Sequence, residues 1–136
     1  MSTGKKLETQ INNFFKHVQI QDRPFWFHQF PVAARCMSRL PKRPADFIFC
    51  HKGITTLLDP KELKQGQRIN IKSRLSQLPK MRQFLYTENS RAFFFVHVLE
   101  NSTFYLIDAA TIPDNVKSVV LENGYPALHA ALGEII

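Results

Sequence analysis

The sequence predicts an α/β fold in which a mixed central β-sheet is flanked by helices, in the order α-β-β-β-α-β-β-α. Three observations predict this class: an apolar stripe at helical spacing opens the chain, short apolar runs separated by turn residues follow, and residues 92–99 form one uninterrupted apolar run. A continuous apolar strand is typical of burial on both faces of a sheet. Helices and strands mixed in this way form one layered core. The 136 residues, 44% of them hydrophobic, are expected to form a single domain, 1–136.

The first half of the chain is expected to contain one helix and three strands. Residues 5–20 predict an amphipathic helix, because its apolar side chains fall on one stripe: Leu7, Ile11, Phe14, Phe15 and Val18. Strands rich in aromatic and β-branched residues are expected at 24–30, 45–51 and 53–59. Residues 34–44 contain four basic residues and two prolines, Pro41 and Pro44, and this composition predicts a basic loop.

The second half predicts a helix, two strands and a helical tail. Residues 62–76 have few apolar positions and are expected to be an exposed segment. A helix is expected over 77–88, with Ser76 as N-cap, Pro79 in the first turn, and buried positions at Leu78, Met81 or Arg82, and Leu85. Strands follow at 92–99 and 104–107. From about Asp114 the tail predicts one or two helices, broken at Gly124-Tyr125-Pro126.

The charge of the chain favours a polyanionic partner. The formal net charge is +7, and its basic residues gather between Arg35 and Arg43 and between Lys61 and Arg82. Nucleic acid is the commonest partner of such a protein, although a basic, merely solvated surface is the alternative. The residues predicted to bind DNA are Arg35, Arg39, Lys42, Arg43, Lys64, Arg68, Lys72 and Arg74.

Several other function classes lack their sequence signals. The two cysteines, Cys36 and Cys50, form no CxxC pair, so a zinc site is not expected. Phosphate-cradling GxxxxGK[ST], GxGxxG and GxSxG motifs are absent, and the five histidines form no HxH or HExxH pair. His97 lies in an apolar strand and is expected to be a satisfied core residue. No signal peptide or membrane span is visible, which favours a soluble, cytoplasmic protein.

Acidic residues and a lysine mark the ends of two neighbouring predicted strands. Asp46 begins one strand, Asp59 closes the next, and Lys61 shares the face of Asp59 because residues i and i+2 of a strand point the same way. Two carboxylates and an ammonium at one strand end are suited to binding magnesium and a phosphodiester. Glu62 and Lys64 form a rival acid-x-lysine pair.

Glu8 lies at the margin of the apolar stripe of the first helix, from which its carboxylate can face a neighbouring strand end. Taken alone, a glutamate near the start of a helix is explained more simply by the helix dipole.

These residues resemble the PD-(D/E)XK nuclease superfamily, and most of all the small Holliday-junction resolvases of the Hjc and RecU type. The resemblance covers roughly residues 7–108 and lies in order and spacing rather than identity. It matches five residues to catalytic positions: Glu8, Asp46, Asp59, Lys61 and Gln77. In that family the helix glutamate and the two central acids bind divalent metal, the middle residue of the acid-x-lysine motif (here Pro60) offers its carbonyl, and the lysine assists the attacking water.

The resemblance implies a restriction-endonuclease-like fold and a magnesium-dependent endonuclease that hydrolyses phosphodiester bonds in DNA four-way junctions. Manganese is expected to substitute for magnesium. A homodimer is expected, since two symmetric nicks need two active sites, and the source is expected to be bacterial, archaeal or a phage.

Two departures from the family pattern stand out: the second acid is Asp59 rather than the commoner Glu, and Pro60 fills the middle position. Two alternatives stay open. One is a related nuclease, similar in layout to the VRR-NUC type, acting on flaps, forks or duplex DNA. The other is a non-catalytic DNA-binding protein with the same fold.

Overall fold

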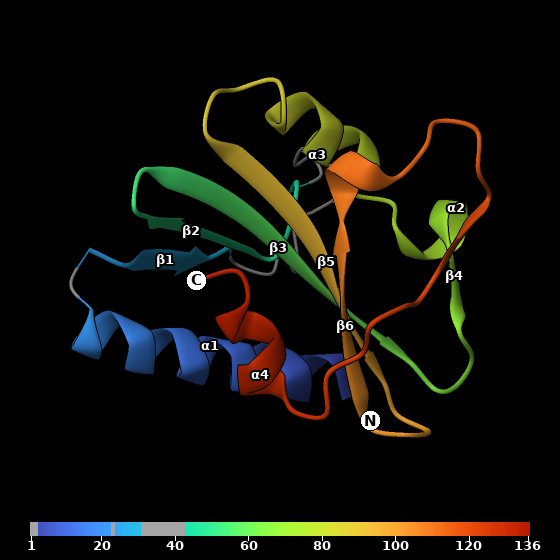
Figure 1. Ribbon diagram of the computed structural model, residues 1–136, viewed down its shortest axis with the longest axis horizontal. Coiled ribbons are helices and arrows are strands. Elements are labelled where there is room, and N and C mark those ends of the chain that lie inside the picture. The colour runs from blue at the N-terminus through green and yellow to red at the C-terminus, as the bar shows by residue number, and fades with distance from the viewer. Residues whose placement is uncertain (1–2, 23, 31–42) are drawn as a thin grey trace, which may run out of the picture.

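A five-stranded mixed sheet forms the centre of the computed structural model, which describes residues 3–22, 24–30 and 43–136 (Figure 1). The strand order is β1-β2-β3-β5-β6. β3 and β5 are parallel, and the other neighbouring pairs are antiparallel. The five strands are β1 (Trp26–Gln29), β2 (Phe47–His51), β3 (Ile54–Leu63), β5 (Ser90–Val98) and β6 (Thr103–Asp108). The predicted mixed sheet is confirmed.

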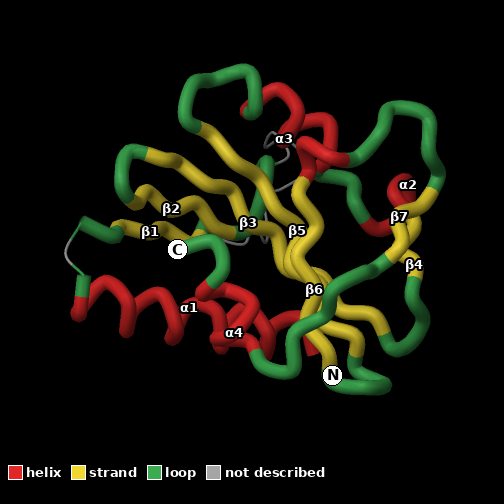
Figure 2. Tube along the Cα trace, in the orientation of Figure 1, coloured by secondary structure: helices red, strands yellow, loops and turns green. Residues whose placement is uncertain are grey.

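Helices cover both faces of this sheet (Figures 1 and 2). α1 (Thr3–Gln21) and α4 (Leu128–Gly133) pack on one face, where Phe15 of α1 and Leu132 of α4 join a cluster with Phe47, Leu58 and Phe95 of the strands. α3 (Leu78–Phe84) packs on the other face against the alternate strand residues. The period of two along each strand therefore divides the core into two layers.

β3 and β5 are the central strands and are buried on both faces. Residues 92–96 are at most 9% exposed, which confirms the burial predicted from the apolar run. β3 extends beyond its neighbour β2, since the pairing of the two strands ends where Phe47 lies opposite Leu58. The last five residues of β3, from Asp59 to Leu63, still pair with β5 but have no β2 partner. In the described part of the chain, the β2 side of β3 is therefore unpaired beside Asp59.

Residues 62–76 are exposed for the most part, as expected, but they contain regular secondary structure and three buried apolar side chains. β3 continues to Leu63, β4 (Arg68–Asn70) and α2 (Ile71–Arg74) follow, and the side chains of Leu63, Ile69 and Leu75 are buried. The apolar residues are too far apart to give a helical or strand period. Their burial depends on β7 (Ser118–Val120), which pairs with β4 from the distant tail.

The same pairing corrects the prediction for the tail. Residues 118–120 form a strand rather than part of a helix, and only the second predicted helix is present, as α4. The break at Gly124-Tyr125-Pro126 is confirmed: Tyr125 forms an isolated bridge with Phe104 of β6. A Cβ atom on Gly124 would lie 2.3 Å from Cγ2 of Thr103, so the close approach of this segment to β6 requires glycine.

The other element boundaries differ little from those predicted. α3 ends at Phe84, four residues before the predicted end, and its N-cap is Gln77 instead of Ser76, with Pro79 in the first turn as expected. Leu78 and Met81 are buried, and Leu85 is half-buried. Most of the predicted basic loop, including Arg35, Arg39 and Lys42, lies outside the described residues. No helix in the described ranges is long and apolar enough to cross a membrane.

Candidate functional site

Asp46 and Asp59 meet where the sheet opens beside β3. Asp46 immediately precedes β2, and its backbone N–H donates a hydrogen bond to Oδ1 of Asp59 over 3.1 Å. Both residues are buried, Asp59 at 1% exposure and Asp46 at 7%. Nζ of Lys61, two residues further along β3, lies 3.1 Å from Oδ2 of Asp59. Strand alternation places Lys61 and Asp59 on one face, as the sequence predicted.

Burial raises the pKa of Asp59 to about 6, from an ordinary value of 3.8. The positive charge of Lys61 opposes this rise, and the negative charge of Asp46 adds to it. Oδ2 of Asp59 is buried, and the Lys61 ammonium, 3.1 Å away, is its ion-pair partner. A buried carboxylate with a raised pKa beside a second carboxylate is typical of a functional site.

Glu8 approaches this pair from α1. Nε2 of Gln29 in β1 donates to Oε1 of Glu8 over 3.2 Å, and Nδ2 of Asn12 donates to Oε1 of Gln29 over 2.7 Å. Burial raises the pKa of Glu8, and the charge of Asp46 raises it further, which shows that the two carboxylates are close enough to interact. Glu8 is half-buried and faces the sheet. The structure thus brings together Glu8, Asp46, Asp59 and Lys61.

Gln29 and Asn12 belong to the site but were not predicted from the sequence. Asn12 lies four residues after Glu8, on the same side of α1, and Gln29 is the last residue of β1. A polar residue at the end of an aromatic strand was the available signal, but its partner could be recognised only once α1 was placed against β1.

Arg43 closes the site from the other side. Its guanidinium pairs with Oδ1 of Asp46 over 2.7 Å and donates to the carbonyl of Phe30 over 3.4 Å. The sequence predicted Arg43 to be a DNA-binding residue, and in the structure it lies directly against one of the proposed metal ligands. Two cations, Arg43 and Lys61, therefore balance two of the three carboxylates.

The donor set of this site suits a hard divalent cation in its chemistry, although the side chains are not gathered around a single point. Carboxylate oxygens are the ligands that magnesium prefers. In the described part of the chain, however, no three acidic, histidine or cysteine side chains are arranged as a metal-binding group. Binding a cation would require Asp46 to exchange its contact with Arg43, and Asp59 its contact with Lys61, for the metal.

The remaining predicted residues lie around this centre or outside the described ranges. Gln77 caps α3 with its backbone, and its side chain accepts a long hydrogen bond from Ser76, at 3.5 Å. Pro60 of β3 pairs with Phe95 of β5, and its side chain lies on the opposite strand face from that of Asp59. The predicted DNA-binding residues after β3 are all exposed: Lys64, Arg68, Lys72 and Arg74.

Glu62 occupies a different environment from Asp59. It lies on the other face of β3 and, with Lys6 and His97, lines a pocket of about 300 Å³ between α1 and the β5–β6 hairpin. Oε1 of Glu62 is buried without a hydrogen-bond partner. The acid that hydrogen-bonds to Asp46 is Asp59.

His97 is stacked on Phe104, with ring centroids 4.1 Å apart, and burial lowers its pKa. Its buried Nε2 has no partner, so the expectation of a satisfied histidine is wrong.

Comparisons with known proteins support the fold. No family model matches the chain, and no curated protein matches its sequence. Among 19 matching chains of solved structures is Hjc from Archaeoglobus fulgidus, described as a Holliday junction resolvase from an archaeal hyperthermophile. Its TM-score is 0.56 at 9% identity, over 88% of this chain and 84% of that one. The chain therefore has an Hjc-like, restriction-endonuclease-like fold.

Proposed function

We propose that this protein is a metal-dependent DNA endonuclease of the PD-(D/E)XK superfamily, and specifically a magnesium-dependent Holliday-junction resolvase. One observation carries the proposal: Asp46, Asp59, Lys61 and Glu8 come together at the open end of a sheet with the Hjc-like fold. The basic charge of the chain, +7, is consistent with a polyanionic substrate.

The residues of the site have distinct roles in this proposal. A divalent cation would be held by the carboxylates of Glu8, Asp46 and Asp59, with the Pro60 carbonyl, and would neutralise charge that develops on the phosphate during attack by water. The Lys61 ammonium orients the attacking water or stabilises the phosphate oxygens. Gln29 holds the Glu8 carboxylate in place through its hydrogen bond.

Arg43 has two roles in the same proposal. Its guanidinium pairs with Asp46 in the structure, and it would be free to contact a DNA phosphate if a cation were bound by Asp46. A homodimer would supply the two symmetric sites that cutting a four-way junction needs.

A non-catalytic DNA-binding protein is the second candidate. Two observations favour it. In the described part of the chain, no three potential ligand side chains are arranged as a metal-binding group, and the carboxylate of Asp46 is paired with Arg43. Such a protein would bind DNA without cutting it, with or without magnesium.

A cleavage assay separates these candidates. Labelled four-way junction, flap and linear duplex of matched sequence are incubated with the protein in magnesium, in manganese and in EDTA, beside the Asp59→Asn variant. Metal-dependent cleavage that prefers the junction and is lost in the variant supports the resolvase. Cleavage of flap or duplex equally well supports the broader nuclease, and binding without cleavage under every condition overturns the enzyme proposal.

A further inference from the structure

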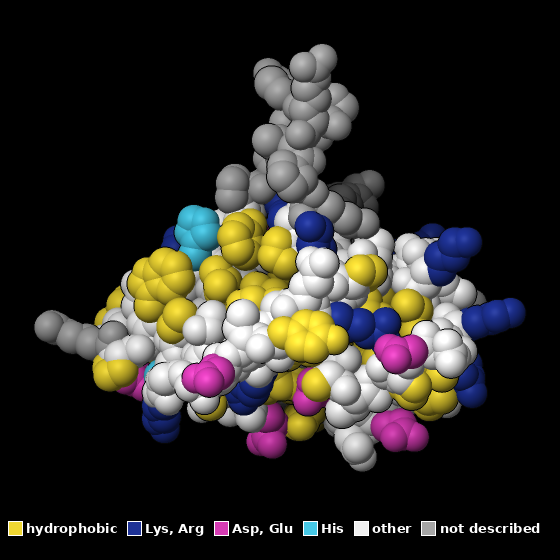
Figure 3. Space-filling view, turned by 90° about the horizontal axis from the view of Figure 1, so that it is seen from above, with side chains coloured by type: hydrophobic (Ala, Val, Ile, Leu, Met, Phe, Trp, Pro, Cys, Tyr) yellow, Lys and Arg dark blue, Asp and Glu magenta, His cyan; other side chains and the backbone are white. Residues whose placement is uncertain are grey.

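Two segments far apart in the sequence form a positively charged lobe at one end of the molecule. We call residues 67–76 and 115–121 the basic lobe; it contains β4, α2 and β7. Arg68 pairs with Val120, and Asn70 with Ser118, across β4 and β7. The basic lobe contains four cationic residues, all exposed, and no acidic residue: Arg68, Lys72, Arg74 and Lys117. Lysine and arginine side chains gather at this end in the space-filling view (Figure 3).

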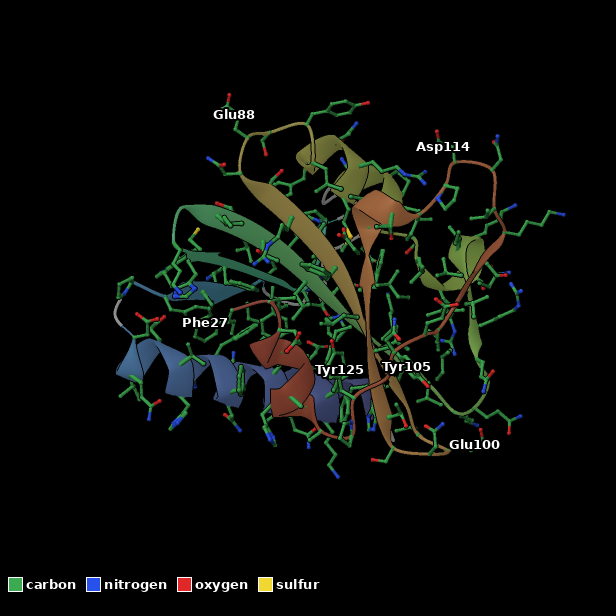
Figure 4. All side chains as sticks on the ribbon, in the orientation of Figure 1. Phe27, Glu88, Glu100, Tyr105, Asp114 and Tyr125 are labelled. Carbon is green, nitrogen blue, oxygen red and sulfur yellow. The ribbon has the colours of Figure 1, made fainter. Side chains whose placement is uncertain are left out.

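Two exposed acidic residues flank the second segment of the basic lobe, Asp114 before it and Glu122 after it. Asp114 is in the loop before β7 (Figure 4). Asp114 lies near Arg82 of α3, 3.6 Å from its guanidinium. Lys72 and Lys117 have no ion-pair partner among the described residues. The positive charge of these two lysines is therefore not neutralised within the described chain.

A groove of about 640 Å³ lies between Lys72 and Lys117. Ile71 and Val116 contribute apolar surface to it, and Val116 is 39% exposed. Oδ1 of Asn70 already accepts hydrogen bonds from the backbone and the hydroxyl of Ser73, at 2.9 and 3.0 Å. The groove thus has cations on its rim but no converging set of free donors that would hold a small anion. Such a surface suits an extended polyanion, to which lysines act as point charges.

We propose that the basic lobe is a second nucleic-acid contact surface, in which Lys72 and Lys117 hold the phosphate backbone of a DNA arm away from the cleavage site. This inference rests on the proposed function. β3 carries Lys61 of the site and ends at Leu63, and the basic lobe begins four residues later, at Gln67. Gln67 is six residues after Lys61, a separation of at most roughly 20 Å along an extended chain, so one DNA arm can reach both the site and the start of the basic lobe.

Charge reversal at one lysine tests the basic lobe. Lys117→Glu is compared with Lys16→Glu, which makes the same charge change at an exposed position of α1. Binding to a fluorescent duplex and to a four-way junction is measured by anisotropy in EDTA over a range of salt. We expect Lys117→Glu, and likewise Lys72→Glu, to weaken binding by roughly tenfold at low salt. The slope of log affinity against log salt should become shallower by roughly 1. Lys16→Glu should change affinity less than twofold.

The outcomes separate this inference from the proposed function, because binding in EDTA does not depend on cleavage. If the Lys117→Glu, Lys72→Glu and Lys16→Glu variants bind DNA with equal affinity, the proposal that the basic lobe contacts DNA is overturned, even if the wild type cuts DNA. A selective loss in the lobe variants supports the lobe, even if the wild type cuts nothing. Binding of the wild type to phosphatidylserine vesicles but not to DNA also overturns it. Thermal unfolding of each variant shows whether a loss of affinity reflects a loss of folding.

Discussion

The backbone amide of Asp46 donates a hydrogen bond to the carboxylate of Asp59, which lies thirteen residues further along the chain. This bond ties the start of β2 to the part of β3 that extends beyond it. It occupies Oδ1 of Asp59 and leaves Oδ2, which is buried beside Lys61. One oxygen of the carboxylate is thus fixed by the fold, and the other is held in the ion pair with Lys61. The same carboxylate carries the predictions on activity and on pH dependence.

The substitutions Asp46→Asn and Asp59→Asn should each abolish metal-dependent cleavage. Each removes a carboxylate that the proposed cation needs, and each also removes negative charge near the phosphate, so DNA binding should be kept or slightly strengthened. Cleavage rates and anisotropy titrations check the two parts separately. Full activity in both variants would sink the assignment of the site.

Asp59→Asn should also change stability in a pH-dependent way. Since burial raises the pKa of Asp59 to about 6 from 3.8, the folded protein binds this proton more tightly than the unfolded chain. The resulting stabilisation is fully present below pH 4 and is lost as the pH rises through about 6. In metal-free buffer at pH 8, where the wild type carries a buried charge, the variant should be more stable by about 1–3 kcal/mol, or a few degrees in Tm. At pH 4 the two should unfold alike, and an equal difference at both pH values would contradict the raised pKa.

Glu8→Gln should lower cleavage severely with little loss of stability. Glutamine keeps the size of the side chain and can still bond to Gln29, and Glu8 lies beyond the first turn of α1, so little stabilisation by the helix dipole is lost. Asn13→Ala, on the exposed side of the same helix, is the control and should cut DNA normally. Rates measured with saturating DNA and magnesium decide the matter. Equal activity of the two variants would mean that Glu8 has no part in the chemistry.

Glu62→Gln should leave cleavage largely intact, because Glu62 lies on the opposite face of β3 from Asp59 and lines a separate pocket with His97. The variant is assayed beside Asp59→Asn on the same junction substrate. If Glu62→Gln is inactive and Asp59→Asn is active, the acid-x-lysine pair is Glu62 with Lys64 instead.

Gly124→Ala should destabilise the fold by about 1–3 kcal/mol. The new Cβ would lie 2.3 Å from Cγ2 of Thr103 and 2.9 Å from Cε1 of Tyr105, so β6 or the tail would have to move. Gly133→Ala is a matched control, since nothing lies within 4 Å of a Cβ at that position. Urea unfolding of both variants gives the comparison. Equal midpoints would show that the tail does not press on β6 as the structure has it.

Local patterns determined most of the central fold. The stripe of α1 and the apolar runs of β2, β3 and β5 are strong signals, because burial on a helix face or in a central strand demands apolar residues at a fixed period. Strand alternation alone predicts that Asp59 and Lys61 lie on one side of β3. The acid-x-lysine spacing, the order of the elements and the family resemblance indicated Glu8, Asp46, Asp59 and Lys61, but not Asn12 or Gln29.

Tertiary structure decided what depends on partners distant in the sequence. Residues 62–76 have no local period, and their three apolar side chains, Leu63, Ile69 and Leu75, are buried in a part of the fold that includes β7, about fifty residues later along the chain. The contact of Gln29 with Glu8 and that of Arg43 with Asp46 depend on how α1 and β1 lie against the open end of the sheet. Lys117 joins Lys72 for the same reason. The sequence determines which residues can be buried or charged. Only the packed chain decides which of them lie next to one another, because long-range contacts depend on the fold as a whole.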